Sequence, residues 1–172
     1  MKDLLIIDGY NFIFNFFKAG KLDNDDIEYY RGKLTADLIA YNSQKDHDLI
    51  LVFDAGKRGN QLRSSEMIDH IEVIYSSEGE TADTIIEELV SEWSDHRKIF
   101  VVTSDYSQQK VIFGKNTVRR SCREFGLELN SVRSDISKRI KKENRNTKRA
   151  FYPLERRLDP EMRKKISDYR KS

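Results

Sequence analysis

The chain has 172 residues, of which 38% are hydrophobic and 35% are charged. This length is sufficient for one domain with a sizeable buried core. No apolar run approaches the ~18 residues of a membrane span, and the N-terminus lacks the basic-then-apolar order of a secretory signal. Cys122 is the only cysteine, which excludes an internal disulfide and a cysteine zinc site. We therefore expect a globular protein in a reducing, cytoplasmic setting.

The net charge of +2 conceals two halves of opposite sign. Residues 1–96 contain 9 Lys or Arg and 20 Asp or Glu, whereas residues 97–172 contain 22 and 9. Residues 133–149 alone hold eight Lys or Arg in seventeen positions. A basic block of this kind favours a polyanionic partner such as nucleic acid. A solvated helical surface would have the same composition, and this alternative stays open.

The first half of the chain shows apolar runs separated by one helical pattern. "DLLIID" at 3–8 is short, continuous and apolar, which predicts a buried strand. Apolar residues recur at helical spacing over 24–44 and predict an amphipathic helix. "DLILVFDAG" at 48–56 predicts a second buried strand, the polar stretch 57–66 a loop, and "HIEVIYS" at 70–76 a more exposed strand.

The second half begins with a helix whose start is marked by capping chemistry. Residues 78–93 have an apolar face, and Thr81 is placed to cap the helix N-terminus. "KIFVVTSD" at 98–105 predicts the third buried strand. Further helical segments are predicted around 106–113, around 116–125 and from 130 to 153.

Buried strands that alternate with helices predict an α/β fold, in which helices flank both faces of a central, mostly parallel sheet. No internal repeat and no Gly/Ser-rich linker divides the sequence. We expect one domain over residues 1–150, with a basic helical segment toward its end, and a charged C-terminal tail over residues 151–172.

Three of the predicted strands end on an aspartate, at Asp8, Asp54 and Asp105. Ligands bind beyond the carboxyl ends of the strands in an open parallel sheet, so these side chains are expected along one edge. Asp83 lies in the first turn of the helix predicted over 78–93 and can project toward the same edge. A single aspartate at a strand end is more often turn chemistry than function. Its repetition here favours a functional acidic site.

Carboxylates that share one site repel one another unless a proton or a cation is bound. Oxygen ligands suit Mg²⁺ or Mn²⁺. His47, His70 and His96 form no spaced pair and are expected at the surface, which argues against zinc. A divalent metal beside a basic half of the chain predicts phosphodiester chemistry, in which the metal lowers the pKa of a bound water and stabilises the leaving oxygen.

The residues around the first and third strand ends fit the same chemistry. Asn11 offers an amide donor and acceptor that can orient a phosphate oxygen or a metal-bound water. Gly9 is expected to permit a tight turn that brings Asn11 back toward Asp8. Thr103 and Ser104 can add hydroxyl groups to the site or cap the helix that follows them.

Four short motifs together resemble a known family. "DGYN" after the first strand, "VFDA" at the end of the second, "ETAD" at a helix start and "TSDY" after the third strand resemble the NYN domains among the PIN-like ribonucleases. The sequence is most similar to the YacP-type bacterial NYN proteins. The likeness extends into "SDYSQQKVIFG" and "VRRSCREFG" and covers about residues 1 to 145.

The resemblance implies a PIN-like, three-layer α/β domain and a metal-dependent endoribonuclease. It further implies an activity that depends on the ribosome, with mRNA cut at the decoding A site during translation and hence a role in mRNA decay. By this resemblance Asp8, Asp83 and Asp105 match the metal-site residues that hold Mg²⁺ or Mn²⁺. Asn11 matches the partner amide of the first motif, and Asp54 stands at the matching end of the second strand.

Basic side chains after the third acidic motif are the predicted contacts with RNA. Contacts from Lys and Arg to phosphate give salt-sensitive affinity rather than sequence choice, which would suit ribosomal RNA. The predicted RNA- or ribosome-binding residues are Lys110, Arg119, Arg120, Arg123, Lys138, Arg139, Lys141 and Lys142.

Two other classes of protein fit parts of the pattern. A non-catalytic RNA- or ribosome-binding protein on the same scaffold would have lost acidic residues, whereas the set here is complete. A receiver-type signalling domain binds Mg²⁺ and could accept a phosphoryl group on Asp54. Such a domain carries a pair of acids on its first strand, however, and here Asp8 is followed by Gly9. The nuclease interpretation is therefore favoured.

Overall fold

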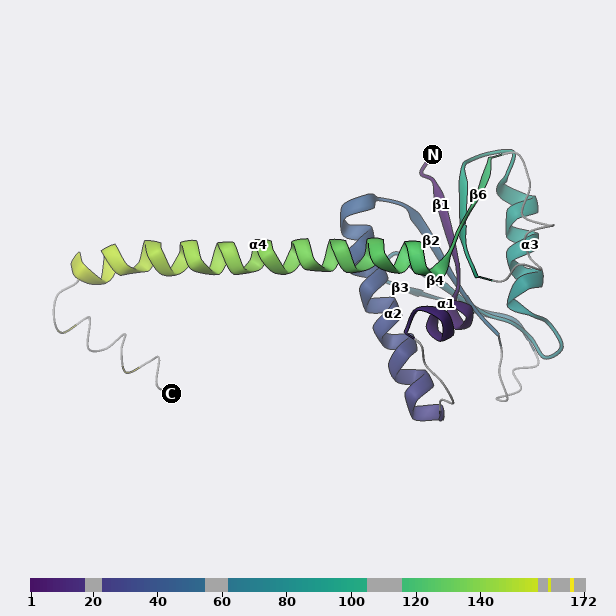
Figure 1. Cartoon of the computed structure of the whole chain (residues 1–172), viewed down its shortest axis with the longest axis horizontal. Coiled ribbons are helices and arrows are strands. Elements are labelled where there is room, and N and C mark those ends of the chain that lie inside the picture. The colour runs from purple at the N-terminus through teal and green to yellow at the C-terminus, as the bar shows by residue number, and fades with distance from the viewer. Residues whose placement is uncertain (18–22, 55–61, 105–115, 158–160, 162–167, 169–172) are drawn as a thin grey trace. The chain divides into compact units, whose positions relative to one another are not determined.

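Figure 1 shows the computed structural model of the chain, which describes residues 1–17, 23–54, 62–104, 116–157, 161 and 168. The chain divides into two compact units, Met1–Arg133 and Ser134–Ser172. The domain boundary predicted at residue 150 stays a prediction, and the helix predicted around 106–113 lies outside the described residues. None of the helices in the described ranges combines the length and the hydropathy that a membrane span requires.

The first unit is built on a sheet that has six strands in the described residues. They are β1 (Leu4–Asp8), β2 (Asp48–Phe53), β3 (Ser64–Ile68), β4 (Ile71–Tyr75), β5 (Ile99–Val102) and β6 (Thr117–Arg120). Their spatial order is β3-β4-β2-β1-β5-β6, and every neighbouring pair is parallel except β3 with β4. The predicted α/β fold with a mostly parallel sheet is confirmed.

Four helices accompany the sheet in the described ranges, and Figure 1 labels them. They are α1 (Gly9–Phe16), α2 (Asn24–Lys45), α3 (Ala82–Trp93) and α4 (Cys122–Arg157). A capping box between Asp23 and Asp26 starts α2, and Asp46 ends it in a left-handed conformation. Thr81 caps α3 as predicted, because its hydroxyl accepts a hydrogen bond from the N–H of Thr84.

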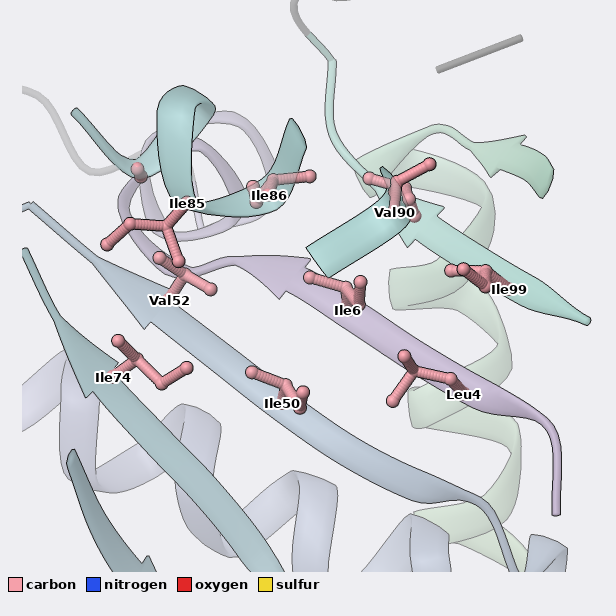
Figure 2. Packing of buried hydrophobic residues seen from close by; sticks show 11 residues of the cluster. Leu4, Ile6, Ile50, Val52, Ile74, Ile85, Ile86, Val90 and Ile99 are labelled. Atoms are coloured by element: carbon pink, nitrogen blue, oxygen red, sulfur yellow. The ribbon is translucent and has the colours of Figure 1, made fainter. Parts of the chain in front are cut away.

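One face of the sheet is covered by α3, as Figure 2 shows. Ile85, Ile86 and Val90 of this helix pack on the sheet. Successive strand residues point to opposite faces, so alternate residues of each strand meet the helix. The sheet residues in this cluster are Leu4, Ile6, Ile50, Val52, Ile74, Ile99 and Val101. The strands read as continuous apolar runs because their other face is buried as well.

Aromatic side chains link α1, α2 and the first turns of α4. The ring of Phe125 in α4 lies 5.9 Å from that of Phe12 in α1 and 5.3 Å from that of Tyr41 in α2. His47 stacks on Tyr41 and meets the edge of Phe100 in β5. The prediction that all three histidines lie at the surface is therefore wrong for His47, which is half-buried and whose pKa is lowered by that burial.

The structure differs from the sequence prediction mainly at the edges of the sheet. Part of the predicted loop 57–66 forms β3, and the predicted helix 116–125 is β6 followed by the start of α4. Edge strands gain their pairing from a neighbouring strand, so a short polar sequence can become a strand without a local signal. The third difference is β4, which was expected to be exposed but lies between β2 and β3. Its buried residues are Ile71, Val73 and Ile74.

Gly9 is the first residue of α1 and not part of a separate tight turn. A Cβ at this position would overlap the ring of Phe53, which is only 1% exposed. Phe53 is itself held between Tyr10 and Tyr75, with ring centroids 5.1 and 5.9 Å away. Gly9 is not among the residues with positive φ. Close packing, and not an unusual backbone angle, is therefore the reason for this glycine.

We expect Gly9→Ala to destabilise the fold by about 1–3 kcal/mol, the usual cost of overpacking a filled core. Gly32→Ala is the matched control, because Gly32 lies inside α2 and an added Cβ would have no atom within 4 Å. The control should be neutral or more stable by about 0.5–1 kcal/mol, since alanine is the better helix former. Urea unfolding measures both effects, and equal stabilities of the two variants would contradict the packing argument.

Candidate active site at the carboxyl edge of the sheet

The carboxyl ends of the central strands meet at one edge of the sheet. Asp8 in β1 lies opposite Val52 in β2, which places Asp54 two residues further along at the same edge. On the other side of β1, Ile7 lies opposite Val102 in β5. Because β4 runs parallel to β2, the connection from β4 to α3 also starts there. The parallel register thus gathers the segments that carry the predicted acidic motifs.

Asp8 is a buried carboxylate at the end of β1, with 6% of its surface exposed. Its Oδ1 accepts a hydrogen bond of 3.0 Å from the backbone N–H of Asn11, so Asp8 is the N-cap of α1. The partial positive charge at a helix N-terminus stabilises a carboxylate in this position. The start of α1 therefore helps to hold a negative charge at the edge of the sheet, where burial alone would oppose it.

The side-chain oxygen of Asn11 joins three parts of the structure. It accepts a hydrogen bond of 2.8 Å from the backbone N–H of Ser104, just beyond β5. It also lies 3.2 Å from the thiol sulfur of Cys122, the first residue of α4, and 3.2 Å from Nδ2 of Asn15. The side-chain amide nitrogen can donate to a substrate. Asn11 was predicted as a site residue, whereas nothing about a lone cysteine indicated a role for Cys122.

Asp54 fastens the start of α3 to the end of β2. Its Oδ1 accepts a hydrogen bond of 2.6 Å from the backbone N–H of Ala82. Asp83 is the next residue, in the first turn of α3, and its side chain is half-buried. One carboxylate oxygen of Asp54 is thus used to position the helix turn that carries Asp83. A direct contact between Asp54 and a metal stays a prediction.

Glu80 stabilises the segment that leads into α3. It accepts hydrogen bonds from the backbone N–H and the hydroxyl of Ser77, at 3.0 and 3.1 Å, and it forms an ion pair with Arg63. Hydrogen bonding to Arg63 is the main reason why the pKa of Glu80 falls to about 2. Arg63 also contacts Glu88, at 2.7 Å. These contacts stabilise the segment that precedes Asp83 in the chain.

The predicted basic contacts differ in how they are used. The Nε of Arg119 donates to the backbone oxygen of Thr103 at 3.3 Å. Arg120 pairs with Glu128 at 2.8 Å, and its guanidinium carbon lies 4.3 Å from the ring centre of Phe100. Both arginines therefore have roles inside the fold. Among the described residues, the predicted basic contacts with exposed side chains are Arg123 in the first unit and Lys138, Arg139, Lys141 and Lys142 in the second.

Two predicted site residues, Asp105 and Lys110, lie outside the described residues. Within the described ranges, no group of three or more His, Cys, Asp or Glu side chains is arranged to hold a metal ion. The donors that the described residues contribute at this edge are carboxylate and amide oxygens, which suit a hard divalent cation. The three-aspartate metal site stays a prediction, because it includes Asp105.

A cavity of about 670 Å³ lies at the other end of the sheet. Its lining includes Asp46 and Asp48, which precede or begin β2 and are paired with Lys2 and Arg97. The strands begin at this edge, whereas ligands of open parallel sheets bind where the strands end. The acidic carboxyl edge is therefore the candidate active site.

Residues 5–171 match the family model of the YacP-like NYN domain. The chain belongs to the YacP-like NYN domain family. It is 34% identical over 141 residues to the uncharacterized protein YacP of Bacillus subtilis (strain 168), over 81% of this chain and 82% of that protein. The crystal structure of Rae1 (YacP) from Bacillus subtilis covers 99% of this chain and 95% of its own, with 29% identity and a TM-score of 0.70. A crystal structure of a mutant of the same protein matches with a TM-score of 0.69 and 33% identity over 83% of each chain.

These matches confirm the resemblance that the four motifs indicated. The YacP-like NYN architecture agrees with the observed sheet and its flanking helices. Membership of this family indicates a nuclease-like, RNA-related function. The carboxyl edge, with Asp8, Asn11, Asp54 and Asp83, is the candidate active site of this YacP-like domain.

A pair of variants should distinguish the structural role of Asp54, as acceptor for the Ala82 N–H, from a role as a metal ligand. Asp54→Ala removes the acceptor of the Ala82 N–H and should destabilise the fold by about 0.5–2 kcal/mol, as for other helix caps. Asp54→Asn keeps an oxygen acceptor and should unfold in urea like the wild type. If Asp54→Asn loses Mn²⁺ binding while its stability is unchanged, Asp54 is a metal ligand.

Proposed function

We propose that this protein is a metal-dependent endoribonuclease that cleaves mRNA in the ribosomal A site during translation and so contributes to mRNA decay. The observation that carries the proposal is the meeting of distant acidic motifs at one edge of the sheet. The hydrogen bond from Ser104 to Asn11 joins the first and last motifs, and the bond from Ala82 to Asp54 joins the second and third. Membership of a nuclease-like family supports the same conclusion.

The metal that we propose is Mg²⁺ or Mn²⁺, held by Asp8, Asp83 and Asp105. The fit rests on donor chemistry, because Asp8 is a buried carboxylate and Asp83 a half-buried one on elements that meet at the same edge. When bound, a divalent ion would lower the pKa of a water and stabilise the leaving oxygen of a phosphodiester. Asp105 follows Ser104 directly in sequence and would complete the set.

The other residues of the edge would position the RNA. The side-chain oxygen of Asn11 is bonded within the protein, and its amide nitrogen is a donor that suits a phosphate oxygen. The exposed Arg123 lies one residue after Cys122, which contacts Asn11, and so is placed near the edge. Its positive charge suits the phosphate backbone of RNA. Contacts with phosphate do not distinguish one base from another.

Contact with the ribosome would come from exposed basic side chains. In the second unit, Lys138, Arg139, Lys141 and Lys142 all lie on the helical segment and are exposed to solvent. Polyanionic ribosomal RNA is the partner that such a segment favours, with an affinity that falls as salt rises. A ribosome-dependent activity places the protein in the cytoplasm.

We expect Asp8→Asn to lower cleavage of a translated mRNA at least ~100-fold, because loss of a metal ligand exceeds the 10–100-fold effect of losing a residue that only supports one. The assay combines purified ribosomes, a translated mRNA and Mg²⁺ or Mn²⁺. Asp69→Asn is the matched control, since Asp69 is exposed in the turn between β3 and β4 and has a left-handed backbone that asparagine accepts. Equal cutting by Asp8→Asn and the control would remove Asp8 from the mechanism.

We expect Arg123→Glu to weaken co-sedimentation with ribosomes, and the difference from wild type to shrink as salt rises. Arg123 is the informative arginine because Arg119 and Arg120 also hold the fold together. Lys98→Glu makes the same change of charge at an exposed residue before the amino end of β5, and it should leave sedimentation unchanged. Identical salt curves for both variants would argue against a contact at Arg123.

A further inference from the structure

Thr103 and Ser104 follow β5 directly, and hydrogen bonds hold both of them in place. The backbone N–H of Thr103 donates to the carbonyl of Arg120 at 3.1 Å, which extends the pairing with β6 by one residue. Ser104 is held by contacts with α1 and α4. Its backbone N–H donates to Oδ1 of Asn11 at 2.8 Å, so a side chain of α1 fixes the path of the chain beyond the sheet.

The side chain of Ser104 completes a small ring of contacts. Its hydroxyl oxygen accepts a hydrogen bond of 3.3 Å from the backbone N–H of Cys122. The thiol of Cys122 in turn lies 3.2 Å from Oδ1 of Asn11. Asn11, Ser104 and Cys122 therefore contact one another in pairs, although 93 residues separate the first two and 18 the last two. We call this group the edge triad.

The chemistry of Cys122 suits a donor and not a reactive thiol. The residue is fully buried, and burial is the main cause that raises the pKa of its thiol. A protonated S–H can donate to the oxygen of Asn11, whereas a thiolate would repel both that oxygen and the nearby Asp8. The backbone N–H of Asn11 donates to Oδ1 of Asp8 at 3.0 Å, which places the edge triad beside the first predicted metal ligand.

We propose that Ser104 and Cys122 are positioning residues, which hold the side chain of Asn11 against the end of β5 and so fix the start of α1 and the Asp8 carboxylate at the metal site. This inference rests on the proposed metal-dependent function. Holding Asn11 in place also holds the backbone N–H that bonds the Asp8 carboxylate. Residues that support metal ligands in this way typically change metal affinity or activity 10–100-fold when they are replaced.

A purely structural role predicts a different result. The first turn of α4 also contains a capping box, in which the hydroxyl of Ser121 accepts from the N–H of Glu124 at 3.2 Å. The same hydroxyl donates to the carboxylate of Glu124 at 2.8 Å. Ser121→Ala therefore removes a hydroxyl from the same helix start while leaving the three members of the edge triad in place. It is the matched control for Ser104→Ala.

The experiment measures Mn²⁺ binding to the full-length protein by the electron paramagnetic resonance signal of free Mn²⁺, and thermal unfolding of the same samples. We expect Ser104→Ala and Cys122→Ala to raise the Kd for Mn²⁺ about tenfold or more. Cys122→Ser keeps a donor and should restore binding to near the wild-type value. Ser121→Ala should lower the unfolding temperature without changing the Kd.

The outcomes separate this inference from the proposed function. If the wild type binds Mn²⁺ and the two alanine variants bind it equally well, the positioning role is overturned while the metal site stands. A rise in Kd for Ser121→Ala as large as that for Ser104→Ala would also overturn it, because a loosened helix start would then be sufficient. If the wild type neither binds Mn²⁺ nor cleaves translated mRNA, the proposed function fails, and the positioning role fails with it.

Discussion

The Asp8 carboxylate is buried at the end of the central strand, and the arrangement of the candidate site follows from the need to stabilise it there. A buried carboxylate is costly unless hydrogen bonds or a cation compensate its charge. The chain meets this requirement by starting α1 at the next residue, so that the N–H of Asn11 and the positive end of the helix face the carboxylate. A helix can begin there only because Gly9 leaves room for the ring of Phe53.

The acidic motifs are joined by hydrogen bonds that use some of their own polar groups. Asn11 uses its oxygen to bind Ser104 and Cys122, and Asp54 uses one oxygen to bind the backbone of Ala82. These bonds tie α1, β5, α4, β2 and α3 to a single edge. These hydrogen bonds preorganise the candidate site, so its polar groups need no rearrangement when a substrate arrives. A sequence motif does not show which polar groups form such bonds and which are ligands.

Features with a local signal were predictable from the sequence. The buried strands are continuous apolar runs, and Thr81 marks the start of α3 by its own hydrogen bond. The edge strands β3 and β6 carried no such signal, because β4 and β5 supply their pairing. The partial burial of His47 likewise could not be predicted from the sequence, because its neighbours Tyr41 and Phe100 come from α2 and β5.

From the amino-acid sequence one can read the alternation of strands and helices, the order of the acidic motifs, the opposite charge of the two halves and the resemblance to the YacP-like NYN family. The use of individual polar groups becomes known only from the folded chain. Asn11 and Asp54 form hydrogen bonds that join separate elements, Arg120 pairs with Glu128, and Cys122 lies at the candidate site. The physical reason is that most of these contacts join residues far apart in the chain. Strand register and helix packing bring them together, and neither is written in any short stretch of sequence.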